Sequence, residues 1–150
     1  MRPLALALLA AALLGPAGEA RAQAEGGPPP ACFVTVIHAL KAEGQALPAL
    51  KPYQPPLAAK AFKKWKSFAL LSQARYRLPP GGKALLSTAK DALELNLVSR
   101  DAGTTRATLK VGKRKAVPLA LTDAAPAQLV DGGSWKGGRL LYGVYCPAGQ

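Results

Sequence analysis

The sequence predicts a mainly β fold, a small β-sandwich or partly open barrel of about seven strands with one short amphipathic helix. Three observations support this prediction. Short apolar or alternating segments recur at regular spacing along the chain, and turns rich in glycine and proline separate them. Only one segment of the expected domain places its apolar residues at helical spacing.

The N-terminal region is typical of a secretory signal peptide. Met1 and Arg2 precede an apolar run over residues 4–14, and Ala20-Arg21-Ala22 resembles a signal-peptidase site. The run is shorter than the roughly 20 residues that a transmembrane helix needs. We therefore expect removal of residues 1–22 and export to the periplasm or the extracellular space. A flexible proline- and glycine-rich tether over residues 23–31 should follow, and then a single β-rich domain over residues 32–150.

The two cysteines are predicted to join the ends of this domain. Residues 33–37 form a run of β-branched and apolar residues that is typical of a central strand, and Cys32 directly precedes it. Cys146 lies at the end of another strand-like segment. Because thiol pairs commonly close in an oxidising compartment, we expect a Cys32–Cys146 disulfide. Two free cysteines, or one bond to another chain, are the alternatives.

One segment has helical character. Prolines within residues 46–56 argue against a regular helix or a central strand in that stretch. After it, the apolar residues at helical spacing are Leu57, Ala61, Trp65 and Phe68. We therefore predict one helix over residues 56–65, followed by a strand over residues 67–72. Trp65 should belong to the core, and the opposite face carries Lys60, Lys63 and Lys64.

Strands separated by turns make up the next part of the chain. Gly81-Gly82-Lys83 is predicted to be a hairpin turn. The clearest alternation follows, with Leu93, Leu95 and Leu97 on one face of a strand and Glu94 and Asn96 on the other. Strands over residues 106–111 and 116–121 come after tight turns and should complete a meander, in which Pro118 suits an edge strand.

The last predicted strand covers residues 139–146. Before it, glycines flank Ser134-Trp135-Lys136 on both sides, which predicts a loop over residues 131–138. A tryptophan at a loop tip can anchor a binding partner, because loops often carry function and tryptophan is favoured at interfaces. Alternatively, the Trp135 indole folds back and caps the sandwich.

Few residues of this chain suggest catalysis. His38 is the only histidine, a zinc site would need further ligands at suitable spacing, and the cysteines are better explained by each other. No serine lies in a Gly-x-Ser-x-Gly motif, since the segment over residues 133–137 differs from that spacing by one residue. We therefore expect no metal, no cofactor and no enzymatic activity. A hydrolase-like enzyme that uses His38 is the alternative.

Positive charge is the strongest compositional feature. The chain has 20 Lys and Arg residues against 8 Asp and Glu, a formal net charge of +12. Outside the cytosol such a charge favours anionic neighbours, because it raises their local concentration and association rate. General solubility would produce the same composition. The basic residues near turns or aromatic rings are Lys60, Lys63, Lys64, Lys110, Lys113, Arg114, Lys115 and Lys136.

The predicted function is therefore that of an exported, non-enzymatic binding or accessory module of the cell envelope. Its candidate binding residues are Trp135 together with the eight basic residues just named. The expected partner is an envelope protein or an anionic surface, such as lipid headgroups or acidic glycans. Nothing in the sequence points specifically to nucleic acid. A structural subunit that assembles through an edge strand is a further alternative.

Overall fold

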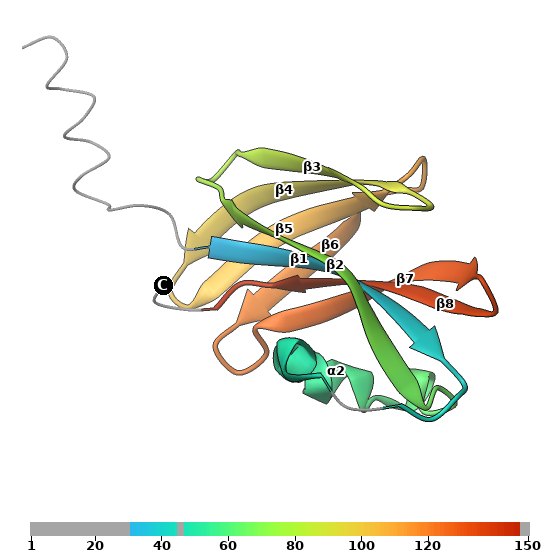
Figure 1. Ribbon diagram of the computed structural model, residues 1–150. Coiled ribbons are helices and arrows are strands. Elements are labelled where there is room, and N and C mark those ends of the chain that lie inside the picture. The colour runs from blue at the N-terminus through green and yellow to red at the C-terminus, as the bar shows by residue number, and fades with distance from the viewer. Residues whose placement is uncertain (1–30, 45–46, 148–150) are drawn as a thin grey trace, which may run out of the picture.

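The structure, a computed structural model, describes residues 31–44 and 47–147. These residues form two antiparallel sheets of four strands each and a helical connection (Figure 1). The two sheets share one core, and the helical connection packs against the opposite face of the first sheet. The predicted mainly β, sandwich-like fold with one short helix is confirmed.

The strands divide between the sheets as follows. The first sheet contains β1 (Ala31–Leu40), β2 (Ser67–Arg77), β7 (Ala127–Trp135) and β8 (Gly138–Tyr145), in the order β2-β1-β8-β7. The second sheet contains β3 (Lys83–Ser87), β4 (Ala92–Asp101), β5 (Thr104–Val111) and β6 (Val117–Thr122), in that order. The predicted meander is confirmed as β4, β5 and β6, with Pro118 in the edge strand β6.

β1 is a central strand, as its sequence predicts. It pairs antiparallel with β2 on one side and with β8 on the other. Both faces of β1 are apolar because the second sheet covers one of them and the helical connection covers the other. Val34 and Val36 pack between the sheets, whereas Ile37 and Ala39 pack beneath the helical connection.

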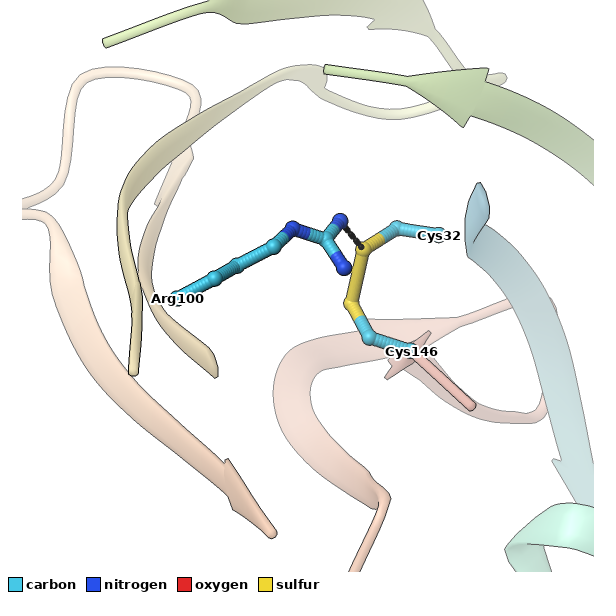
Figure 2. The surroundings of a disulfide bond; sticks show 3 residues. All are labelled: Cys32, Arg100 and Cys146. Atoms are coloured by element: carbon cyan, nitrogen blue, oxygen red, sulfur yellow. Dashed lines mark hydrogen bonds between the residues drawn. A yellow bond between two sulfur atoms is a disulfide. The ribbon is translucent and has the colours of Figure 1, made fainter. Parts of the chain in front are cut away.

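The disulfide between Cys32 and Cys146 is confirmed. It joins β1 to the residue that follows β8, with 4.3 Å between the two Cα atoms and a sequence separation of 114 residues. Both cysteines are buried, and Figure 2 shows the side chain of Arg100 reaching the bond from β4. Its Nη2 lies 3.3 Å from the Sγ atom of Cys32. Such a buried disulfide indicates an oxidising compartment.

Two apolar clusters hold the layers together. Between the sheets, alternate residues of β4, β5 and β6 meet alternate residues of β1 and β8. On the other face of the first sheet, Tyr53 is fully buried beside Ile37 and Leu141. Its hydroxyl lies 2.8 Å from the Oγ1 atom of Thr35, to which Gln73 also donates a hydrogen bond. The helical connection is thus fixed to the sheet by an aromatic ring and a buried hydroxyl pair.

The helix predicted over residues 56–65 is wrong in its bounds. The connection instead consists of η1 (Pro48–Tyr53), a 3-10 helix, then the single α-helical turn α2 (Gln54–Leu57), then η2 (Lys60–Phe62), again 3-10. Prolines fit the first turn of a helix, so the proline-rich stretch expected to be irregular contains η1 and the start of α2. Ala61 is exposed, and Phe62 takes its place on the packed face. Trp65 packs in the second cluster, as predicted.

The loop predicted over residues 131–138 is also wrong. Strand β7 continues through Asp131, Gly132 and Gly133 to Trp135, and only Lys136 and Gly137 form the turn to β8. A bulge between Asp131 and Gly133 absorbs the irregular backbone. Gly133 has a φ of +90°, a left-handed conformation that favours glycine.

Three further boundaries differ from the sequence prediction. β2 is one strand from Ser67 to Arg77, and the described residues form eight strands instead of about seven. Gly81-Gly82-Lys83 does not close a hairpin, because β2 and β3 belong to different sheets. Ala31, expected in the tether, is buried and begins β1. The signal peptide and residues 23–30 lie outside the described residues. In the part of the chain that the structure describes, no helix is long and apolar enough to cross a membrane.

Candidate functional site

Three turns lie at one end of the sandwich. They are the turns between β3 and β4, between β5 and β6, and between β7 and β8, all on the right of Figure 1. Hydrogen bonds join the first two of these turns to the bulge of β7, since Lys90 Nζ donates to the carbonyl of Gly132 (2.6 Å) and Arg114 Nη2 to that of Asp131 (3.0 Å). The cations of these turns and of the β7–β8 hairpin, here called the basic end, are Lys90, Lys113, Arg114, Lys115, Lys136 and Arg139.

Asp131 is an acidic residue within the basic end, where two arginines contact it. Arg139 holds its carboxylate with two nitrogens, Nε 2.7 Å from Oδ1 and Nη2 2.6 Å from Oδ2. The amide of Gly133 also donates to Oδ1, at 2.8 Å. Partial burial alone would raise the pKa of Asp131, but these bonds and the charges of Arg139 and Arg114 outweigh it and lower that pKa. Asp131 is therefore an ionised internal partner of the arginines.

The bulge that carries Asp131 depends on two glycines. At Gly132 a Cβ atom would lie 2.7 Å from the Cε2 atom of Tyr142 and 3.0 Å from the carbonyl oxygen of Leu140. Gly133 supplies the left-handed backbone conformation that turns its amide toward the carboxylate. The Asp-Gly-Gly sequence thus forms the bulge and presents Asp131 to the arginines.

Tyr142 links the β3–β4 turn to the core beneath the basic end. Its hydroxyl donates to Asp91 Oδ2 at 2.8 Å, and Asp91 is itself held in a turn by its amide bond to Thr88 Oγ1 at 2.9 Å. Burial, together with the hydrogen bond and negative charge of Asp91, raises the pKa of Tyr142 to about 12. The basic end thus contains six cations and two carboxylates, Asp91 and Asp131, so positive charge predominates.

The raised pKa of Tyr142 predicts a loss of stability in alkali. Between its ordinary pKa of 10.0 and about 12, the unfolded chain releases the phenolic proton while the folded chain keeps it. Stability from this group is thus complete below pH 10 and falls as the pH rises toward 12. We expect Tyr142→Phe to show a shallower fall than the wild type in urea unfolding across this range. An unchanged slope would contradict this account of Tyr142.

Trp135 is half-buried at the end of β7 and packs against the core between the sheets. Lys136 Nζ lies 4.7 Å from the centre of its ring. Of the two interpretations of Trp135 from the sequence, this arrangement matches the one in which the indole folds back over the sandwich.

His38 is buried under the β7–β8 hairpin. Its Nε2 atom lies 3.0 Å from the carbonyl oxygen of Trp135, and its ring contacts the indole edge-on with 4.9 Å between the centres. Gly138 leaves the space for this ring, because a Cβ there would lie 2.8 Å from Nε2. Among the residues described, no group of three or more His, Cys, Asp or Glu side chains is placed to hold a metal ion.

The other predicted basic residues lie elsewhere. Lys110 is exposed on the outer face of the second sheet, directly across from Glu94 on β4. The exposed residues Lys60, Lys63 and Lys64 belong to the helical connection on the far side of the first sheet. The structure therefore unites Lys113, Arg114, Lys115 and Lys136 at the basic end, and it separates them from these four lysines.

An apolar groove of about 490 Å³ lies between the helical connection and the edge strands β6 and β7. Prolines and alanines dominate its lining, with Phe62 and Leu129 among the larger side chains. Gln128 is the only polar side chain among the lining residues. The groove therefore has few groups that could distinguish one ligand from another, in contrast to the basic end.

Comparison with known proteins gives no assignment. No protein-family model matches the chain, and no match was found among curated proteins or among solved structures.

Proposed function

We propose that this protein is an exported, non-enzymatic binding module of the cell envelope that binds anionic surfaces through its basic end. The observation that carries this proposal is the convergence of cations from two separate turns on the bulge of β7, where Arg139 also binds. Lys90 donates to the carbonyl of Gly132, which lies 42 residues away in sequence. Arg114 donates to the carbonyl of Asp131, which lies 17 residues away. The signal-like N-terminal sequence and the buried disulfide support export.

The side chains of the basic end are held in place more firmly than the lysines of the helical connection. Lys90 and Arg114 are already held by hydrogen bonds to backbone carbonyls, so these two side chains lose less freedom when an anion binds. Lys60, Lys63 and Lys64 project from one segment, where lysines opposite an apolar face are an ordinary solvated surface. We therefore expect the basic end to bind an anion more strongly than an equal number of positive charges on the helical connection.

The chemistry of the basic end suits anionic oxygen groups. Arginine matches the geometry of carboxylates and phosphates with two parallel donors, and lysine adds a compact charge. Phosphates of lipid headgroups and carboxylates or sulfates of acidic glycans share this chemistry. Vesicles that contain phosphatidylglycerol and a heparin column, used as separate probes, distinguish the two sources.

Two charge-matched triple variants test the proposal. We expect Lys113→Gln/Arg114→Gln/Lys115→Gln to weaken binding to phosphatidylglycerol vesicles by about 100-fold, since each cation near an anionic surface contributes about 1 kcal/mol. Lys60→Gln/Lys63→Gln/Lys64→Gln removes the same charge and should weaken binding by less than about fivefold. Phosphatidylcholine vesicles measure the uncharged background.

Two results would overturn the proposal. If the two triple variants lose binding equally, overall charge drives the interaction and the basic end has no special role. If the wild type binds neither anionic vesicles nor heparin above the uncharged background at low salt, the protein is no anion-binding module. Retention that persists at high salt would also argue against it, because binding to charged surfaces weakens as salt rises.

A further inference from the structure

Asp131 occupies the position in which a ligand anion would meet the best donors of the basic end. Arg139 offers two nitrogens to one carboxylate, Gly133 adds a backbone amide, and Arg114 is bonded to the carbonyl of Asp131 itself. This combination of a forked guanidinium and an amide is the kind of donor set that proteins use for carboxylates and phosphates. In this structure the donors are satisfied from within the chain.

We propose that Asp131 is an internal competitor, which an anionic group of the ligand displaces from Arg139 when a polyanion binds. This inference rests on the proposed function of the basic end. The exchange is open to solvent, since the side chains of Asp131 and Arg139 are 48% and 34% exposed. No covalent bond changes, because one anion replaces another on the same guanidinium.

Internal competition selects ligands by their number of charges. Asp131 is tethered beside Arg139, so its effective concentration there far exceeds that of a free small anion. A single phosphate therefore exchanges poorly with it. A polyanion gains from Lys113, Lys115 and Lys136 at the same time, and these contacts offset the displacement of Asp131. The structure thus points to a densely charged polymer or surface as the ligand, in preference to small anions.

The critical variant is Asp131→Asn, with Asp123→Asn as its control. Asparagine keeps an oxygen to accept the Gly133 amide, but it removes the charge that holds Arg139. Asp123 is exposed in the turn between β6 and β7, where it lines a depression with Arg100 and Cys146 at the disulfide end. Both variants change the net charge equally, so a difference between them isolates the local competition.

We expect Asp131→Asn to bind a heparin-derived oligosaccharide about fivefold more tightly than the wild type in isothermal titration calorimetry, and Asp123→Asn to change affinity less than about twofold. The gain should vanish when Arg139→Gln is combined with Asp131→Asn. In nuclear magnetic resonance, millimolar inorganic phosphate should shift the Arg139 Nε–H signal of Asp131→Asn and leave that of the wild type in place.

The outcomes separate this inference from the proposed function. If the wild type binds the oligosaccharide but the two Asn variants change its affinity equally, Asp131 is no competitor, and the proposed function stands. A gain that persists with Arg139→Gln would overturn the inference in the same way. If neither the wild type nor Asp131→Asn binds the oligosaccharide or anionic vesicles, both the proposed function and the inference are wrong.

Discussion

Replacing Cys32 and Cys146 by alanine is expected to lower the free energy of unfolding by about 4 kcal/mol, close to what a loop of roughly 100 residues predicts in the chain-entropy model. The bond spans 114 residues and joins the two ends of the described domain. Without it, the unfolded chain gains conformational freedom that the remaining contacts must overcome. Urea unfolding of the variant and the wild type measures the difference, which is comparable to the stability margin of a small domain.

Reduced wild-type protein is the control for this prediction. It keeps both sulfur atoms in the core beside Arg100, so it separates the effect of the bond from that of a cavity. We expect the reduced protein to lose most of the same free energy. A loss below about 1 kcal/mol in both samples would show that the sheets hold the ends of the chain together without the bond.

Tyr53→Ala is expected to destabilise the fold by about 3 to 5 kcal/mol, the range for removing a large buried aromatic side chain. The side chain of Tyr53 is 0% exposed, and it fixes the helical connection to the first sheet. Its removal leaves a cavity over Gly143 and takes away one of the two hydrogen-bond partners of the Thr35 hydroxyl, the other being Gln73. Thermal and urea unfolding measure the loss.

Two further variants identify the source of that loss. Tyr53→Phe keeps the ring and removes only the hydroxyl, so it should lose about 1 kcal/mol. Gly143→Ala places a Cβ atom 2.8 Å from Cζ of Tyr53, and such overpacking costs about 1 to 3 kcal/mol. In the Tyr53→Ala background this penalty should disappear. Strict additivity of the two substitutions would contradict the packing of Tyr53 against Gly143.

Local patterns in the sequence predict those parts of the fold that local physics determines. Alternation identifies β4 and β5 because each has one face in the core and one in solvent. The cysteine pair predicts the contact between β1 and the residue after β8, since two thiols have only one pairing within a chain. In β8, Leu140 and Tyr142 face one cluster and Leu141 the other, as the alternation indicates.

Two elements were mispredicted because local patterns were ambiguous. Apolar residues at helical spacing predict a helix over residues 56–65. The connection instead contains the 3-10 helices η1, which includes two prolines, and η2, which places Phe62 on the packed face. The glycine pair after Asp131 is typical of a turn, yet here it forms a bulge within β7. A bulge and a turn use the same residue types, and only the pairing with β8 distinguishes them.

The candidate site was only partly predictable for a different reason. Lys113, Arg114 and Lys115 are consecutive, so the sequence displays them as a group. Lys90 and Arg139 lie far from them in sequence, and only the arrangement of the two sheets brings all of them to one end. The sequence does offer one signal for the Asp131–Arg139 pair. The two residues carry opposite charges and lie eight positions apart, on either side of a short hairpin turn.

A residue-by-residue map of the binding surface shows directly whether anions bind at the basic end. Isotope-labelled protein is titrated with the heparin-derived oligosaccharide, and backbone amide shifts are recorded by nuclear magnetic resonance at low and at high salt. If anions bind at the basic end, the largest shifts fall in the β5–β6 turn and the β7–β8 hairpin, and they vanish at high salt. Largest shifts around Lys60, Lys63 and Lys64, or equal shifts over all basic residues, would contradict binding at the basic end.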